Sequence, residues 1–214
     1  MRRLQHLVFQ PASRLARLMI GEKRLTCDPE AAEDPAAHLP VFVDLDGARC
    51  EGLWAIFDHL EGLYPENPLL PEDAGERAEA LRWLDWTLAI LAERVTRRIV
   101  YEKANPRFTG AGLRSTPDMN VIRTGREALG AALAALVQAV ERHGNLAGRT
   151  SSVADLAVAA QLSALDYFGE VPWDTHPVMR EWYVRMKSRS CFRSLLADRV
   201  PGQPPVAHYA ELDF

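Results

Sequence analysis

The sequence predicts a small α/β unit over residues 1–70 followed by an all-helical unit over residues 76–214. The first part of the chain contains short apolar runs bounded by turn residues. This pattern is typical of brief strands. Three prolines fall between residues 65 and 75 and mark a linker. After this linker, apolar residues recur at helical spacing throughout, so a mixed unit precedes a helical one.

The first predicted elements are a strand and a helix. Residues 7–9 form a short apolar run that ends before a proline, which predicts a brief buried strand. Ser13 is predicted to cap the helix that follows, since serine side chains accept hydrogen bonds from free N–H groups at helix starts. Residues 21–25 close this helix. Residues 27–38 are rich in Pro, Ala and acidic residues, which predicts a loop.

A hairpin and a helix complete the first unit. The apolar run at 40–44 predicts a second strand, Asp46 and Gly47 predict a two-residue hairpin turn, and residues 48–51 its partner strand. Residues 52–63 carry apolar side chains at helical spacing, and that helix should end before Pro65.

The second unit is predicted to consist of helices joined by short irregular segments. Residues 105–117 are expected to form a loop. Gly144 is expected to end the helix that spans residues 118–143. The predicted helices span residues 76–101, 118–143, 152–168, 178–189 and 191–197.

Composition excludes several classes of protein. The 214 residues are 48% hydrophobic and carry a formal net charge of −4, which argues against disorder and against a nucleic-acid-binding protein. The most apolar stretch, residues 128–140, is shorter than the roughly 20 residues of a membrane span, so no membrane association is expected and the protein is predicted to be cytoplasmic. Three widely spaced cysteines and six scattered histidines show no metal-binding spacing.

Three features occur together in an informative order. Leu39 and Pro40 stand at the start of a predicted strand, and Glu51 follows Pro40 by eleven residues at the start of a helix. Ser152 and Asp155 have the spacing of a capping box. In this order of units, these features resemble the glutathione transferase superfamily. The resemblance implies a thioredoxin-like α/β N-terminal domain, an all-α C-terminal domain and a homodimer.

The resemblance also implies a glutathione site. Pro40 would follow a cis peptide bond, which turns the backbone of Leu39 toward the cysteinyl part of glutathione. Glu51 would meet the γ-glutamyl end, next to free N–H groups at a helix start near Gly52.

This sequence departs from the family pattern at three places, all on the glutathione site. The family usually has Tyr, Ser or Cys after the first strand to stabilise the glutathione thiolate, and here that position is Gln10, with Ser13 one turn later as a substitute. Gly52 replaces the serine that commonly follows the acid. The stretch 25–40 is too short for the usual second strand and second helix. Together these departures predict a glutathione site that is weak or lost.

The C-terminal half resembles an alphaproteobacterial branch of the superfamily, known for a protein that binds the tubulin-like division protein FtsZ. The similarity rests on residues 11–14, 165–173 and 200–214. It implies a weakly catalytic or non-catalytic, pseudoenzyme-like regulator of FtsZ filaments in cell division. The alternative is an active transferase that conjugates glutathione to electrophiles, with Gln10 or Ser13 as hydrogen-bond donor to the thiol.

Charge is distributed unevenly along the chain. Acidic residues dominate 28–79, whereas arginines and a lysine dominate 180–199. Two solvated faces explain this pattern, and so does docking within a dimer or onto an acidic partner. For the second case, Arg189 and Arg193 are the candidate partner-binding residues.

Overall fold

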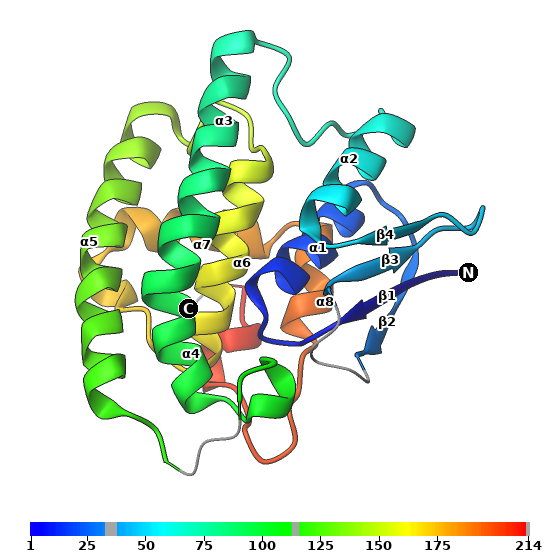
Figure 1. The fold of residues 1–214 in the computed structure, drawn as a ribbon. Coiled ribbons are helices and arrows are strands. Elements are labelled where there is room, and N and C mark those ends of the chain that lie inside the picture. Colours follow the sequence, from blue (N-terminus) through cyan, green and yellow to red (C-terminus); the bar gives the residue numbers. More distant parts are fainter. Residues whose placement is uncertain (33–37, 113–115, 213–214) are drawn as a thin grey trace.

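The computed structural model describes residues 1–32, 38–112 and 116–212. Figure 1 shows two parts: a small sheet with two helices near the N-terminus, and a larger bundle of helices beside it. This is a thioredoxin-like α/β N-terminal part with an all-helical C-terminal part, as the sequence predicts. The exact boundaries at residues 70 and 76 stay a prediction. Among the described residues, no helix is both long and apolar enough to cross a bilayer.

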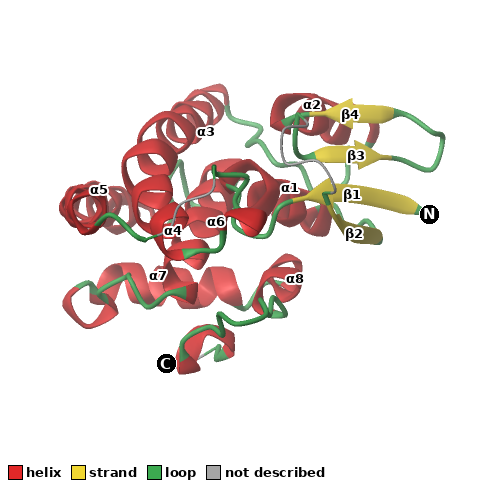
Figure 2. Cartoon of the chain, turned by 60° about the horizontal axis from the view of Figure 1, so that its bottom comes forward, coloured by secondary structure: helices red, strands yellow, loops and turns green. Residues whose placement is uncertain are grey.

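The sheet has four strands in the order β2-β1-β3-β4. They are β1 (Arg2–His6), β2 (Cys27–Ala31), β3 (Val41–Val43) and β4 (Arg49–Glu51). β1 pairs with β2 in parallel, and the other two pairs are antiparallel. Helix α1 (Pro11–Glu22) makes the crossover that parallel strands need. It lies between the sheet and the helical bundle (Figures 1 and 2).

The first strand lies earlier than predicted. Residues 7–9 are not a strand: Gln10 N–H donates to the carbonyl of Leu7, so the chain turns there into α1. β1 instead spans Arg2–His6, where Leu4 and His6 are buried in alternation. The pattern of apolar runs does not reveal this strand, because most of its residues are polar. They are polar because one side of the strand stays partly exposed.

A strand also occupies much of the predicted loop at 27–38. Residues Cys27–Ala31 form edge strand β2, which explains why Pro29 is tolerated there. The usual second strand is therefore present in the stretch 25–40, which was predicted to be too short for the second strand and the second helix together. Between β2 and β3, the described residues contain no helix, and residues 33–37 lie outside the description.

Ser13 does not cap α1, contrary to the prediction. The N-cap residue is Gln10, Pro11 takes the first helical position, and Ser13 lies inside the first turn. Proline is favoured at that first position because its missing N–H would have no partner there anyway. The signal for the helix start was therefore the proline rather than the serine.

The hairpin and the following helix are confirmed, with one difference. Asp44 N–H bonds the carbonyl of Ala48, and Gly47 at φ +86° bonds Asp44. Residues 45–47 thus make a three-residue turn with glycine in the left-handed position, rather than the predicted two-residue turn. Helix α2 (Leu53–Leu63) then ends before Pro65.

The helical part follows the predicted order. The predicted helix 76–101 is one helical path made of α3 (Ala74–Trp86), a π-helical stretch (Thr87–Thr96) and α4 (Arg97–Lys103). The spacing of apolar residues did not reveal the change in hydrogen-bond pattern. The remaining helices are α5 (Met119–His143), α6 (Val153–Tyr167), α7 (Pro177–Lys187) and the short α8 (Arg193–Leu196).

Helix α6 is the centre of the bundle. All of its residues are buried, and it packs against α1, α3 and the π-helical stretch. The predicted capping box begins it: Ser152 N–H donates to Asp155 Oδ2 at 2.9 Å, and Ala154 N–H donates to the Ser152 hydroxyl. Burial raises the pKa of Asp155, yet Trp182 Nε1 and Leu146 N–H also donate to it. This cap therefore joins three segments of the bundle.

Candidate functional site

The six residues predicted to hold glutathione come together at one end of the sheet. Ser13 hydrogen-bonds Gln10 and the Leu7 backbone, and Leu7 packs in one cluster with Leu39 and Val41. Pro40 bonds Gly52 through its carbonyl, at 2.8 Å, and Glu51 precedes that glycine. The loop after β1, the start of β3 and the β4–α2 junction thus lie next to one another.

Gln10 and Ser13 form a closed pair. The fully buried Ser13 hydroxyl donates to Gln10 Oε1 at 2.5 Å and accepts the Leu7 N–H at 3.3 Å. Its proton is therefore used inside the loop. The Gln10 side chain is half-buried, and its amide N–H₂ group has no partner among the described residues. In this arrangement Ser13 orients Gln10, and Gln10 offers the free donor.

The Leu39–Pro40 peptide bond is cis, as the resemblance implied. Leu39 is buried against Leu7 and Val41, so its side chain faces the protein. The Pro40 carbonyl accepts a hydrogen bond from the N–H of Gly52, which directly follows β4. The backbone of this segment is thus fixed from both sides, as a binding wall requires.

Glu51 and Gly52 have different surroundings. Glu51 is half-exposed and pairs with Arg49 of the same strand at 2.8 Å, a weak surface pair that leaves the carboxylate open to a ligand. Gly52 has φ +81° and ψ 163°, a conformation that is essentially restricted to glycine. A Cβ atom there would also clash with Nε2 of His38 in its present position. The backbone conformation therefore disfavours the serine that the family commonly has, and the side chain of His38 would also have to move aside.

Helix α2 begins directly after Gly52, with no side-chain cap. The first N–H groups of a helix have no partner within the helix, and they favour an anion. This is the place where the resemblance puts the γ-glutamyl carboxylate. Of the family's contacts for that group, this chain keeps the backbone N–H groups and lacks the hydroxyl.

Arg14, which was not among the predicted site residues, holds this loop in place. Arg14 is fully buried and donates to the Val8 carbonyl, Asp198, Ser163 and the Tyr209 hydroxyl, at 2.8–3.0 Å. The loop between β1 and α1 is therefore anchored to α6 and to the C-terminal segment. Two arginines among the buried apolar residues of α1, Arg14 and Arg17, were the available signal, because a charge is buried only with partners.

The two predicted partner-binding residues lie away from this site, in the C-terminal segment. Arg189 forms an ion pair with Glu22 at the end of α1. Arg193 is exposed, and its guanidinium has no hydrogen-bond or ion-pair partner among the described residues. Of the two, Arg193 is the cation that remains open to a partner.

The three cysteines are free thiols, and none has the lowered pKa of a nucleophile. Burial raises the pKa of Cys27 to about 11 and that of Cys191 to about 12. Burial also raises the pKa of Cys50. Among the described residues, no group of three or more His, Cys, Asp or Glu side chains could hold a metal ion.

The structure closely matches that of a known enzyme class. It superposes on the crystal structure of a glutathione S-transferase from Rhodospirillum rubrum with a TM-score of 0.92, at 37% sequence identity and with both chains fully covered. The chain belongs to the glutathione transferase superfamily.

Within the superfamily it lies in the branch of FtsZ-localized protein A. It is 41% identical to that protein of Caulobacter vibrioides in an alignment of 228 residues, which covers all of this chain and 98% of the relative. The structure of FzlA from C. crescentus matches with a TM-score of 0.91 and 39% identity, over all of this chain and 99% of the other. No protein-family profile matches the chain.

Proposed function

We propose that this protein associates with FtsZ filaments in the cytoplasm and regulates cell division, as a transferase-fold protein with little or no catalytic activity. The similarity to FtsZ-localized protein A over the full chain carries this proposal. A partner-binding role needs the fold, which the chain keeps along its whole length.

The glutathione site supports weak or absent catalysis. To lower the pKa of the glutathione thiol, a site needs a strong donor or a positive field. Here the hydroxyl of Ser13 donates to Gln10, which leaves only a neutral amide as the donor. Gly52 supplies no second hydroxyl, and its backbone conformation disfavours any other residue there. These features favour the regulator over the active transferase.

The partner surface includes Arg193, with Arg189 beside it. FtsZ would present acidic side chains to this surface, since the open guanidinium of Arg193 favours a carboxylate. We also expect a homodimer, in which the acidic N-terminal unit of one subunit contacts basic residues of the other.

Co-sedimentation with FtsZ polymers tests the partner. Wild-type protein should pellet with FtsZ assembled with GTP at low salt, and Arg193→Glu should bind about five- to tenfold more weakly. Arg149→Glu is the matched control, because Arg149 is an exposed arginine in a different segment. Arg189→Glu is less informative, since it also breaks the pair with Glu22. Absence of wild-type protein from the pellet at low salt would contradict the proposal.

Isothermal titration calorimetry with glutathione tests the site. We expect a dissociation constant of about 1 mM or weaker, and a further loss of binding in Gln10→Ala. Ser13→Ala should weaken binding less, because Ser13 acts by orienting Gln10. Micromolar binding together with turnover of a generic electrophile such as 1-chloro-2,4-dinitrobenzene would instead establish the active transferase.

A further inference from the structure

The tail of the chain, residues 200–212, brings one buried side chain to the start of α1. Tyr209 belongs to a short 3-10 helix (Ala207–Ala210) and is fully buried. Its hydroxyl accepts a hydrogen bond from Arg14 Nη2 at 2.8 Å and donates to the Leu195 carbonyl at 2.8 Å. Tyr209 thus connects the tail to α1.

A polar link runs from Tyr209 to the loop that carries Gln10. Arg14 Nη1 donates to the carbonyl of Val8, two residues before Gln10, at 3.0 Å. The backbone N–H of Arg14 donates to the carbonyl of Gln10 at 3.1 Å. A buried charged donor that loses one acceptor shifts toward others, because an unmade hydrogen bond is costly there. Movement of the Arg14 guanidinium would therefore also move this loop.

An aromatic link joins the same two places. The rings of Tyr209 and Tyr167 meet edge to face with centroids 5.0 Å apart, and those of Tyr167 and Phe9 do so at 4.9 Å. This geometry is the favourable one for aromatic pairs. Phe9 is fully buried and directly precedes Gln10. The ring of Tyr209 therefore supports the loop through Tyr167, independently of its hydroxyl.

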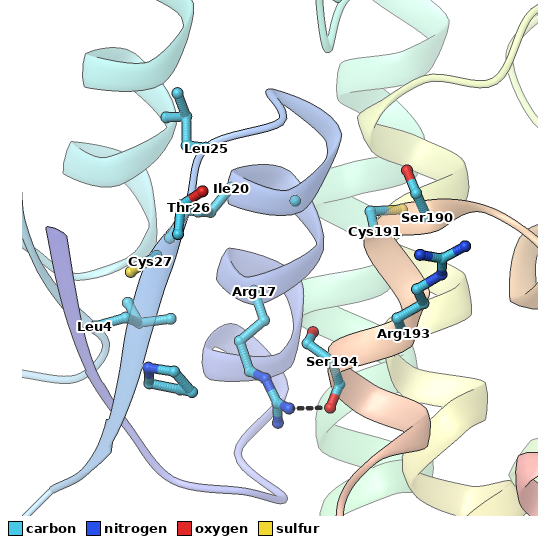
Figure 3. A pocket seen from close by; sticks show the side chains of 12 residues that line it. Leu4, Arg17, Ile20, Leu25, Thr26, Cys27, Ser190, Cys191, Arg193 and Ser194 are labelled. Carbon is cyan, nitrogen blue, oxygen red and sulfur yellow. Dashed lines mark hydrogen bonds between the residues drawn. The ribbon is translucent and has the colours of Figure 1, made fainter. Parts of the chain in front are cut away.

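Other contacts hold the tail and the residues before it on the helical part. His208 Nε2 lies 2.9 Å from Asp166 Oδ1 of α6, and Lys187 Nζ donates to the His208 carbonyl at 3.2 Å. Figure 3 shows Arg17 of α1 reaching the Ser194 carbonyl of α8. None of these contacts involves the loop before α1. Tyr209 is thus held in place independently of the loop that it supports.

We propose that Tyr209 is a positioning residue for Gln10, so that docking of the tail and ordering of the candidate glutathione site are coupled. Tyr209 acts through Arg14 and Phe9. Lifting the tail would loosen Gln10, and a ligand ordered on Gln10 would in turn favour the docked tail, since such coupling is reciprocal. The inference rests on the glutathione site proposed above and does not depend on association with FtsZ.

Hydrogen exchange measured by mass spectrometry tests this coupling in the protein without ligand. Tyr209→Phe removes the hydroxyl and keeps the ring. Exchange in residues 7–14 should rise about tenfold, because a buried charged donor loses an acceptor, whereas exchange in α5 should stay as in the wild type. Tyr101→Phe is the matched control, since the hydroxyl of Tyr101 has no hydrogen-bond partner among the described residues.

The side-chain amide signals of Gln10 in a ¹⁵N–¹H spectrum report its position directly. Their loss in Gln10→Ala assigns them. They should shift or broaden in Tyr209→Phe and stay in place in Tyr101→Phe, whereas a hydroxyl that only stabilises the fold would leave them unmoved in both.

Three results would overturn the proposal: wild-type exchange in residues 7–14 of Tyr209→Phe, unmoved Gln10 signals, or an equal rise of exchange in α5. The last would mean that the variant loosens the whole molecule. Because these measurements contain neither glutathione nor FtsZ, their outcome is distinct from those of the calorimetric and co-sedimentation tests.

Discussion

Gln10, the N-cap residue of α1, and Arg14, one turn later, have very different surroundings. Arg14 uses its Nε and both terminal nitrogens on four acceptors in the seam with α6 and the C-terminal segment. At the candidate glutathione site, the amide N–H₂ group of Gln10 has no partner among the described residues and Glu51 is half-exposed. Saturated bonding marks the part of the helix that holds the molecule together. Spare donors mark the parts where a ligand can be bound.

The largest effect is expected in the seam. Arg14→Met removes a buried charge and leaves Tyr209, Ser163 and the Val8 carbonyl without this donor. The free energy of unfolding should fall by about 3–5 kcal/mol, because breaking a buried network leaves its other members unpaired. Urea unfolding measures this, with Arg3→Met on the exposed surface as control. A loss below 1 kcal/mol would show that the network is not structural.

The seam also predicts a dependence of stability on pH. Burial first, and then the charge of Arg17, lower the pKa of His6 from 6.5 to about 4. The unfolded chain therefore takes up the proton near pH 6.5 while the folded protein stays neutral, so stability is lost as the pH falls from about 6.5 to about 4. The size of this loss is about 3 kcal/mol.

Comparison with His6→Gln isolates this effect from the carboxylates. Urea unfolding at pH 7 and at pH 4 should show a smaller decrease in the variant than in the wild-type protein, by about the same amount. Parallel pH profiles of the two proteins would show that His6 is not held neutral in the fold.

The smallest effect is expected at the candidate glutathione site. Gly52→Ser should lower the free energy of unfolding by about 1–3 kcal/mol, because it combines a strained backbone with a clash against His38. In a His38→Ala background the clash is removed and the backbone strain remains, so part of the cost should persist. Complete recovery in the double variant would show that His38 alone excludes the side chain.

Much of this fold was predictable from local patterns. Ser152 and Asp155 predicted the start of α6, Gly144 predicted the end of α5, and Asp46 with Gly47 predicted the hairpin. These signals work because caps and turns depend on neighbouring residues. β1 and β2 were missed because their residues look polar, and they are strands by virtue of pairing with each other.

The candidate site divides in the same way. The positions of Leu39, Pro40 and Glu51 were predicted from a resemblance in spacing, and the structure brings them together with Gln10 and Ser13. The spacing gave no indication that Ser13 donates to Gln10. This hydrogen bond depends on side-chain geometry rather than on the order of residues along the chain.

By itself, the sequence determined the order of the two structural parts, the helix boundaries set by caps and prolines, and the family resemblance. The tertiary structure alone decided which polar groups are satisfied. Arg14 contacts Asp198 and Tyr209, which lie 184 and 195 residues further along the chain. Gly52 lies close to His38, at the other end of the β3–β4 hairpin. Contacts of this kind arise from packing, because burying a polar group requires a partner wherever that partner stands in the sequence.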